Sequence, residues 1–178
     1  LKGIGIVFDG LPPGITIDLE EIEESMRRRA PGANEFGTRR KEEDKVEILS
    51  GIFQGKTTGA PLCGMIRNKD TRSGDYDASL LRPGTADLTA YLKYKGYHDF
   101  RGSGHFSGRI TAPLTFAGSV ARQLIRGAGI EIKAHILQIG NVWDKKFDPV
   151  DSLGAPIHDR REFPVLDPFA GEAMKEEI

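Results

Sequence analysis

The segment RGSGHFSGR, from Arg101 to Arg109, combines the residue types that an anion-binding loop requires. Its glycines, Gly102, Gly104 and Gly108, allow the backbone to approach a ligand, and successive backbone N–H groups in such a loop can surround an anion. The terminal arginines can clamp a phosphate or a carboxylate through paired hydrogen bonds. The same residues would also suit a flexible connector that carries two arginines, and the pattern alone leaves both interpretations open.

Two serines and an aromatic residue extend this chemistry toward a phosphorylated ligand that contains a ring. Ser103 and Ser107 supply hydroxyl donors, and Phe106 offers an apolar ring face. A helix is expected to follow the loop, and the dipole at a helix N-terminus favours anions. We therefore predict that the loop belongs to the active site of an enzyme rather than to a structural module.

Other charged and titratable residues have simpler interpretations. Arg27–Arg29 close an expected helix, where cations interact favourably with the helix dipole. His98 beside Asp99 fits an orienting pair, whereas His135 is expected to be an ordinary strand residue. The histidine spacing matches no metal site, and the one cysteine, Cys63, excludes an internal disulfide and a multi-thiolate site, so we predict no protein-held metal.

The elements that position these residues follow from apolar periodicity and from capping residues. Asp18 is expected to cap a helix, with Glu21 completing a capping box, and Thr111 is expected to cap another, with Pro113 in its first turn and Gly127 at its end. The apolar face of this second helix is expected to comprise Leu114, Ala117, Ala121 and Leu124. The expected strands are 4–8, 46–51, 60–67 and 130–143, and the expected helices are 18–29, 87–94, 111–127 and 168–178.

Composition and the order of the elements indicate the class of protein. Of the 178 residues, 38% are apolar and 29% are charged, and strands and helices come in mixed order, which indicates a soluble α+β protein. The formal net charge of −1 argues against a general nucleic-acid-binding surface. No apolar run reaches the roughly 20 residues needed to cross a membrane, and no signal peptide is evident, so a cytoplasmic protein fits best. Because the chain starts without methionine and stops inside a helical pattern, we expect sequence to be missing at both ends.

Six motifs share their order and spacing with one enzyme family. They are DGLPPG (9–14), RRRAPG (27–32), DKVEILSGIFQGKTTGAP (44–61), NKDTRSGDY (68–76), RPGTADLT (82–89) and DFRGSGHFSGRITAP (99–113). Each motif alone is modest, but together they are specific. In this order they resemble the chorismate synthase family, and the HFSGR form is typical of its Clostridium-like type.

The resemblance implies a β-α-β sandwich, an α+β fold with a helical layer between antiparallel sheets, assembled as a homotetramer. It implies a lyase of the shikimate pathway that converts 5-enolpyruvylshikimate 3-phosphate to chorismate and phosphate, in aromatic amino acid biosynthesis. The reaction is a 1,4-elimination, and the cofactor is reduced FMN, although the reaction has no net redox change. NADP is associated with the family, and no nucleic acid or membrane partner is implied. Residues 1–178 would form a single, incomplete domain.

The resemblance also assigns site residues. Substrate binding falls on Arg29, Arg82, Ser107 and Arg109, and the FMN contacts fall on His105, Phe106 and Ser107.

Position 85 is where the resemblance fails, because Thr85 in RPGTAD occupies the place of a catalytic histidine. Threonine does not titrate near neutral pH and cannot replace an imidazole as general acid. The family's GESHG motif, which contains another proton-donating histidine, would lie upstream of residue 1. An alternative therefore stays open, a module that binds a phosphorylated ligand without catalysis, and we expect the 178-residue chain alone to be inactive.

A further interpretation is a protein that binds single-stranded nucleic acid and stacks bases on Tyr97 and Phe106. The near-neutral charge disfavours it.

Overall fold

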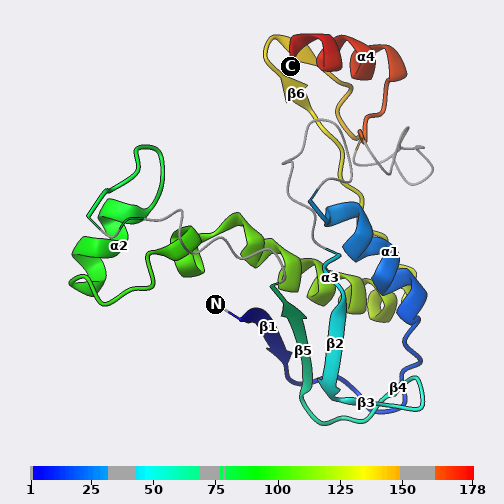
Figure 1. The fold of residues 1–178 in the computed structure, drawn as a ribbon. Helices are drawn as coiled ribbons and strands as arrows, with labels where there is room; N and C mark the ends of the chain where they lie inside the picture. Colours follow the sequence, from blue (N-terminus) through cyan, green and yellow to red (C-terminus); the bar gives the residue numbers. More distant parts are fainter. Residues whose placement is uncertain (1, 32–42, 69–76, 78, 149–162) are drawn as a thin grey trace. The chain divides into compact units, whose positions relative to one another are not determined.

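The computed structural model describes residues 2–31, 43–68, 77, 79–148 and 163–178 (Figure 1). Contacts divide the chain into two compact units, Leu1–Ala128 and Gly129–Ile178, which are described separately. Helices and antiparallel strands together confirm the predicted α+β class. Among the described residues, no helix is both long and apolar enough to span a bilayer. That residues 1–178 form one incomplete domain stays a prediction.

An antiparallel sheet organises the first unit, with β5 (Leu62–Arg67) between β1 (Gly3–Phe8) and β2 (Val46–Ser50) (Figure 1). The predicted strands at these places are confirmed. In the register, Ile6 and Ile48 both lie opposite Gly64 of the central strand. Because side chains alternate between the two faces of a strand, this register gathers one set of apolar residues on the core face. They are Ile4, Ile6, Phe8, Val46, Ile48, Leu62 and Ile66.

The helices α1 (Leu19–Arg29) and α3 (Thr111–Arg126) pack against each other and build the core with the sheet. The Phe116 ring of α3 meets the Phe8 ring of β1 edge to face, with centroids 5.7 Å apart. Leu114, which we expected on the apolar face of α3, is instead 59% exposed. The core consists of Ile17, Ile22, Met26, Leu62, Ile66, Ala112, Phe116 and Val120.

Asp18 caps α1 as predicted, because its Oδ1 accepts from the backbone N–H groups of Glu20 and Glu21 at 2.9 and 3.1 Å. The predicted capping box is wrong, however. The backbone N–H of Asp18 donates to Gln123 Oε1 at 2.8 Å, while the Glu21 carboxylate accepts from Arg122 on α3. The guanidinium groups of Arg122 and Arg126 on α3 both bind the Glu21 carboxylate, and they attract it more strongly than one backbone amide would.

Between β2 and β5 in the sequence, the chain forms a short hairpin of β3 (Ile52–Phe53) and β4 (Lys56–Thr57). This hairpin was not predicted. The Thr57 hydroxyl donates to the Pro12 carbonyl at 2.6 Å and accepts from the Ile15 N–H at 2.9 Å. The hairpin therefore holds the turn that leads from β1 to α1.

The second unit contains β6 (Gln138–Ile139), β7 (Val142–Trp143) and α4 (Pro168–Glu177). The predicted strand 130–143 is wrong for residues 130–137, which lie outside any strand. At Gly140 the backbone takes a positive φ of 54°, so the alternating segment folds back into a two-stranded ribbon.

His135, in the second unit, is not the ordinary strand residue that we expected. Its Nδ1 lies 2.9 Å from Asp144 Oδ2, and both side chains are buried. Burial of Asp144 raises its pKa, but hydrogen bonds from the backbone N–H groups of Leu166, Asp167 and Lys145 and from His135 together lower the pKa overall. The Asp144 carboxylate therefore connects the segment at His135 with the segment that precedes α4.

Candidate active site

A fully buried carboxylate, that of Asp44, joins two of the arginines that the sequence singled out. Asp44 Oδ2 accepts from Arg29 Nη1 at 2.5 Å, and Asp44 Oδ1 accepts from Arg109 Nη1 at 2.7 Å. The side chain of Asp44 is 0% exposed, and those of Arg29 and Arg109 are 19% and 18% exposed. Two cations around one anion leave a local charge of +1, which suits an anionic ligand.

Secondary structure brings these groups together from distant parts of the chain. Arg29 is the last residue of α1, Asp44 precedes β2, and Arg109 lies in the 3₁₀-helix η3 (Gly108–Ile110), which leads into α3. Asn68 follows β5, and its Oδ1 accepts from Arg109 Nε at 2.6 Å. Arg29, Asp44, Asn68 and Arg109 are called the Asp44 cluster below.

Sequence reasoning missed Asp44 and Asn68 as members of this site. The available signal was their position as the first residues of the motifs DKVEILSG and NKDTRSGDY. In the sequence, Asp44 follows two glutamates, and this pattern predicts one more solvated charge.

Two hydroxyl groups support the arginines. Arg29 Nε donates to Thr111 Oγ1 at 3.2 Å, and the Thr111 hydroxyl donates to the Gly108 carbonyl at 2.7 Å. The prediction that Thr111 caps α3 is wrong, because Thr111 is the first helical residue and Ile110 stands at the cap without a side-chain bond. Ser107 caps η3, since its Oγ accepts from the backbone N–H of Arg109 at 3.2 Å.

Arg82 belongs to a second group of contacts, ahead of α2 (Asp87–Tyr94). Its Nε and Nη2 bind the two oxygens of Asp87 at 2.8 and 2.9 Å, and Nη2 also donates to Ser103 Oγ at 3.0 Å. The Arg82 guanidinium holds the pKa of the Asp87 carboxyl well below its usual range. Arg82 is thus fixed both to α2 and to the glycine-rich loop.

Thr85, the residue at the position of the expected histidine, is exposed and lies in the turn before α2. Its hydroxyl donates to the Arg82 carbonyl at 3.0 Å and accepts from the Asp87 N–H at 3.3 Å. The side chain therefore shapes the backbone beside Arg82.

The glycine-rich segment forms the 3₁₀-helix η2 (Arg101–Phe106), which is interrupted by left-handed backbone at Gly102, Ser103 and Gly104. A Cβ atom at Gly104 would stand 2.5 Å from the Asp99 carbonyl oxygen, so this position requires glycine. At Gly104 the missing side chain thus admits the chain's own backbone, whereas a Cβ atom at Gly108 would meet nothing within 4 Å.

The arginines at the two ends of the glycine-rich loop hold different carboxylates. Arg101 Nε and Nη2 bind the two oxygens of Asp99, each at 2.8 Å, whereas Arg109 binds Asp44. The Arg101 guanidinium lowers the pKa of Asp99 to about 2. The predicted pairing of His98 with Asp99 is therefore wrong, because the stronger cationic donor is two residues further along.

An aromatic group stands at the end of the same loop. The rings of His105 and Phe106 have centroids 4.1 Å apart, and His105 Nε2 lies 3.2 Å from the Tyr94 hydroxyl. Phe106 is 41% exposed. Two of the three residues predicted to contact FMN, His105 and Phe106, thus offer a partly open ring surface beside Tyr94 of α2.

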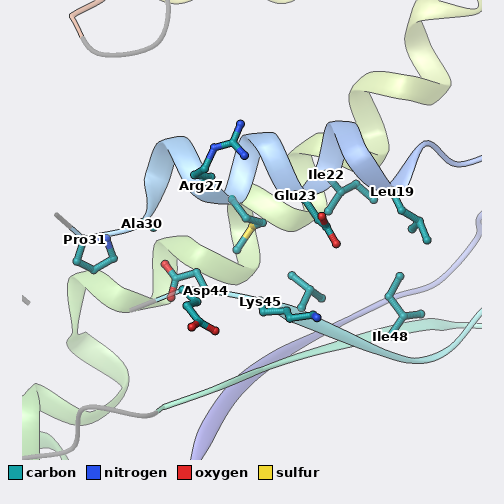
Figure 2. A pocket seen from close by; sticks show the side chains of 12 residues that line it. Leu19, Ile22, Glu23, Arg27, Ala30, Pro31, Asp44, Lys45 and Ile48 are labelled. Atoms are coloured by element: carbon teal, nitrogen blue, oxygen red, sulfur yellow. The ribbon is translucent and has the colours of Figure 1, made fainter. Parts of the chain in front are cut away.

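A cavity of about 530 Å³ lies between α1 and β2 (Figure 2). Its lining combines apolar residues with five charged ones, Glu23, Arg27, Glu43, Asp44 and Lys45, and includes none of Arg29, Arg82, Ser107 and Arg109. The cavity therefore shares Asp44 with the Asp44 cluster but contains none of the predicted substrate-binding residues. Within the part of the chain that the structure describes, no three His, Cys, Asp or Glu side chains gather in a way that could hold a metal ion.

Comparisons with known proteins agree on one family. The family model described as chorismate synthase matches residues 1–178. The chain is 41% identical over 180 residues to a chorismate synthase of Thermococcus kodakarensis, covering 99% of this chain and 48% of the relative. It is 51% identical over 142 residues to one of Ralstonia pickettii, covering 78% of this chain and 38% of the relative. A crystal structure of chorismate synthase matches with a TM-score of 0.57 and 28% identity, over 80% of this chain and 35% of that one. The chain thus spans less than half the length of these relatives.

Proposed function

Because the chain belongs to the chorismate synthase family, we propose that the protein containing it converts 5-enolpyruvylshikimate 3-phosphate to chorismate and phosphate. The observation that carries this proposal is the convergence of Arg29 and Arg109 on the buried Asp44. Both arginines are proposed substrate ligands, and their motifs stand far apart in the sequence. The alternative, a module that binds without catalysis, has no support in the comparisons.

The substrate is a polyanion, with a phosphate and carboxylate groups. Arg29 and Arg109 form the cationic part of the Asp44 cluster, and Arg82 adds another guanidinium held by Asp87. Ser107 lies beside Arg109 and can add a hydroxyl donor to the same anion. In the 1,4-elimination a C–O bond breaks and the phosphate leaves as an anion. A C–H bond also breaks, its hydrogen is lost formally as a proton, and a second ring double bond forms. Fixed guanidinium groups stabilise that developing charge.

Reduced FMN is the proposed cofactor, and the residues of the loop fit such a group. The partly exposed ring of Phe106 beside His105 suits a flat aromatic system, and Ser107 offers a polar contact. A bound reduced flavin would supply transient electron transfer to the elimination, with no net redox change. His105, Phe106 and Ser107 would hold the flavin in place, while the arginines orient the substrate.

Thr85 sets a limit on the proton chemistry. Its hydroxyl is engaged with the backbone of Arg82 and Asp87 and does not titrate near neutral pH. The proposed enzyme therefore works without a general acid at position 85.

We further propose that the enzyme is a cytoplasmic homotetramer in which residues 1–178 are part of one larger domain. This enzyme needs no nucleic acid or membrane partner.

The test uses the full-length protein with 5-enolpyruvylshikimate 3-phosphate and chemically reduced FMN under anaerobic conditions. We expect chorismate and phosphate in equal amounts, and no turnover with oxidised FMN. The 178-residue chain alone is expected to be inactive. Absence of turnover by the full-length protein with reduced FMN would overturn the proposal.

A further inference from the structure

We propose that Asp44 is a positioning residue that holds Arg29 and Arg109 together as one binding unit for the anionic groups of the substrate. The inference rests on the function proposed above, because that function makes both arginines substrate ligands. Asp44 itself does not touch the substrate in this proposal. It acts through the two guanidinium groups.

The geometry at Asp44 is specific to both partners. Each carboxylate oxygen serves a different arginine, Oδ2 binding Arg29 Nη1 at 2.5 Å and Oδ1 binding Arg109 Nη1 at 2.7 Å. The carboxylate thus fixes the distance between the two guanidinium groups as well as their directions. A single-oxygen contact would fix neither.

The backbone of Asp44 indicates that this placement is enforced. Its φ is +48°, in the left-handed region that non-glycine residues enter only at an energetic cost. Such strain persists where the surroundings determine the conformation. At Asp44 the surroundings are two charged hydrogen bonds to a side chain that is 0% exposed.

Charge explains why a carboxylate is needed. Arg29 and Arg109 are each more than four-fifths buried, and like charges in such an environment repel each other. Neutral groups hold the other edge of each guanidinium, Thr111 for Arg29 and Asn68 for Arg109. Asp44 is the charged contact that both arginines share, so its removal separates them while leaving each with a neutral anchor.

The expected effect is on binding. Arginines that are already ordered bind an anion without the entropic cost of bringing them together. If that order is lost, KM rises, because part of the binding free energy of the substrate is then used to bring the two arginines together. Once bound, the substrate still holds both guanidinium groups at its anionic groups, so kcat changes little.

Asp44→Asn in the full-length protein tests this, with Glu47→Gln as the matched control. Glu47 also binds an arginine through both oxygens, Arg67, but on an exposed part of the sheet. We expect Asp44→Asn to raise KM for 5-enolpyruvylshikimate 3-phosphate at least about tenfold, with kcat within about threefold. Glu47→Gln should leave both within about twofold.

The outcomes separate this inference from the proposed function. An inactive wild-type protein refutes the function, whereas an active wild type with an unchanged KM in Asp44→Asn refutes the positioning role alone. If Asp44→Asn does not fold, Asp44→Glu decides, because it keeps the charge but shifts its position: a raised KM supports the role, and the wild-type KM refutes it. Failure of both variants to fold also refutes the inference, since Asp44 would then serve the stability of the fold.

Discussion

The ring of Phe116 lies directly against the backbone of Gly64, so that a Cβ atom at position 64 would stand 2.4 Å from Cε1 of the ring. Gly64 is in the middle of the central strand, and Phe116 is fully buried in α3. The missing side chain lets the helix approach the sheet closely. Because η3 runs directly into α3, this approach also sets where Arg109 lies.

Gly64→Ala is expected to destabilise the chain by about 1–3 kcal/mol, because the added methyl group must displace a buried ring. Gly118→Ala is the matched control, since Gly118 lies in α3 and a Cβ there would meet nothing within 4 Å. It should stabilise the helix by up to roughly 1 kcal/mol. Urea unfolding of both variants measures the difference, and equal stabilities would contradict the packing described for Phe116.

Glu21 makes the stability dependent on acid pH. Arg126 and Arg122 bind its carboxylate at 2.6 Å each and hold the pKa of Glu21 below its ordinary value. A lowered folded-state pKa means that this stabilisation is present above the pKa of the unfolded chain, about 4.3, and is lost as pH falls through the folded-state value.

The corresponding variant is Glu21→Gln, which should lower the free energy of unfolding by about 1 kcal/mol at neutral pH. The difference from wild type should shrink below about pH 4. Urea unfolding at a series of pH values gives both curves. A constant difference across the series would mean that the ion pairs between α1 and α3 do not contribute.

Arg82→Lys tests the second arginine site. A lysine cannot occupy both oxygens of Asp87 and also reach Ser103, as the planar Arg82 fork does. We expect KM for the substrate to rise roughly tenfold in the full-length protein. Arg67→Lys, which breaks the similar pair with Glu47 on the sheet, should change KM by less than about twofold. Equal effects of the two variants would remove Arg82 from the substrate site.

Thr85→His should restore a titrating group beside Arg82. A positioned general acid contributes about 10²–10⁴-fold to a rate, so even an imperfectly placed imidazole should raise kcat at least about tenfold. The gain should decline as pH rises above about 6.5, where the imidazole loses its proton. Steady-state turnover with reduced FMN between acid and alkaline pH measures this. An unchanged kcat would show that the proton donor lies elsewhere in the protein.

The local elements could be predicted from the sequence because their causes are local. Alternating apolar residues identified β1, and Asp18 identified the start of α1. The choice between two faces of α3 could not be made in this way. Leu114 and Phe116 both belong to stripes with helical spacing, and what buries the Phe116 stripe is the space above Gly64 in a strand that lies 52 residues earlier.

The site could be predicted only in part, for the same reason. The glycine-rich loop and its arginines are visible as a pattern, and the resemblance assigned Arg29 and Arg109 to the substrate. Their convergence on Asp44 depends on where β2 begins relative to two helices, and no local pattern contains that information. The side-chain bond from Glu21 to α3 instead of to its own cap is a tertiary contact of the same kind.

The binding proposed at the Asp44 cluster would make ligand affinity a measure of how completely the first unit has folded. Its hydrogen bonds connect residues 15, 41 and 65 positions apart, so opening any one of the contributing segments dismantles the whole cluster. Ligand binding that requires the assembled cluster stabilises all these segments together. A substitution far from the ligand can therefore weaken binding by loosening a distant segment, and a bound anion can rescue such a variant.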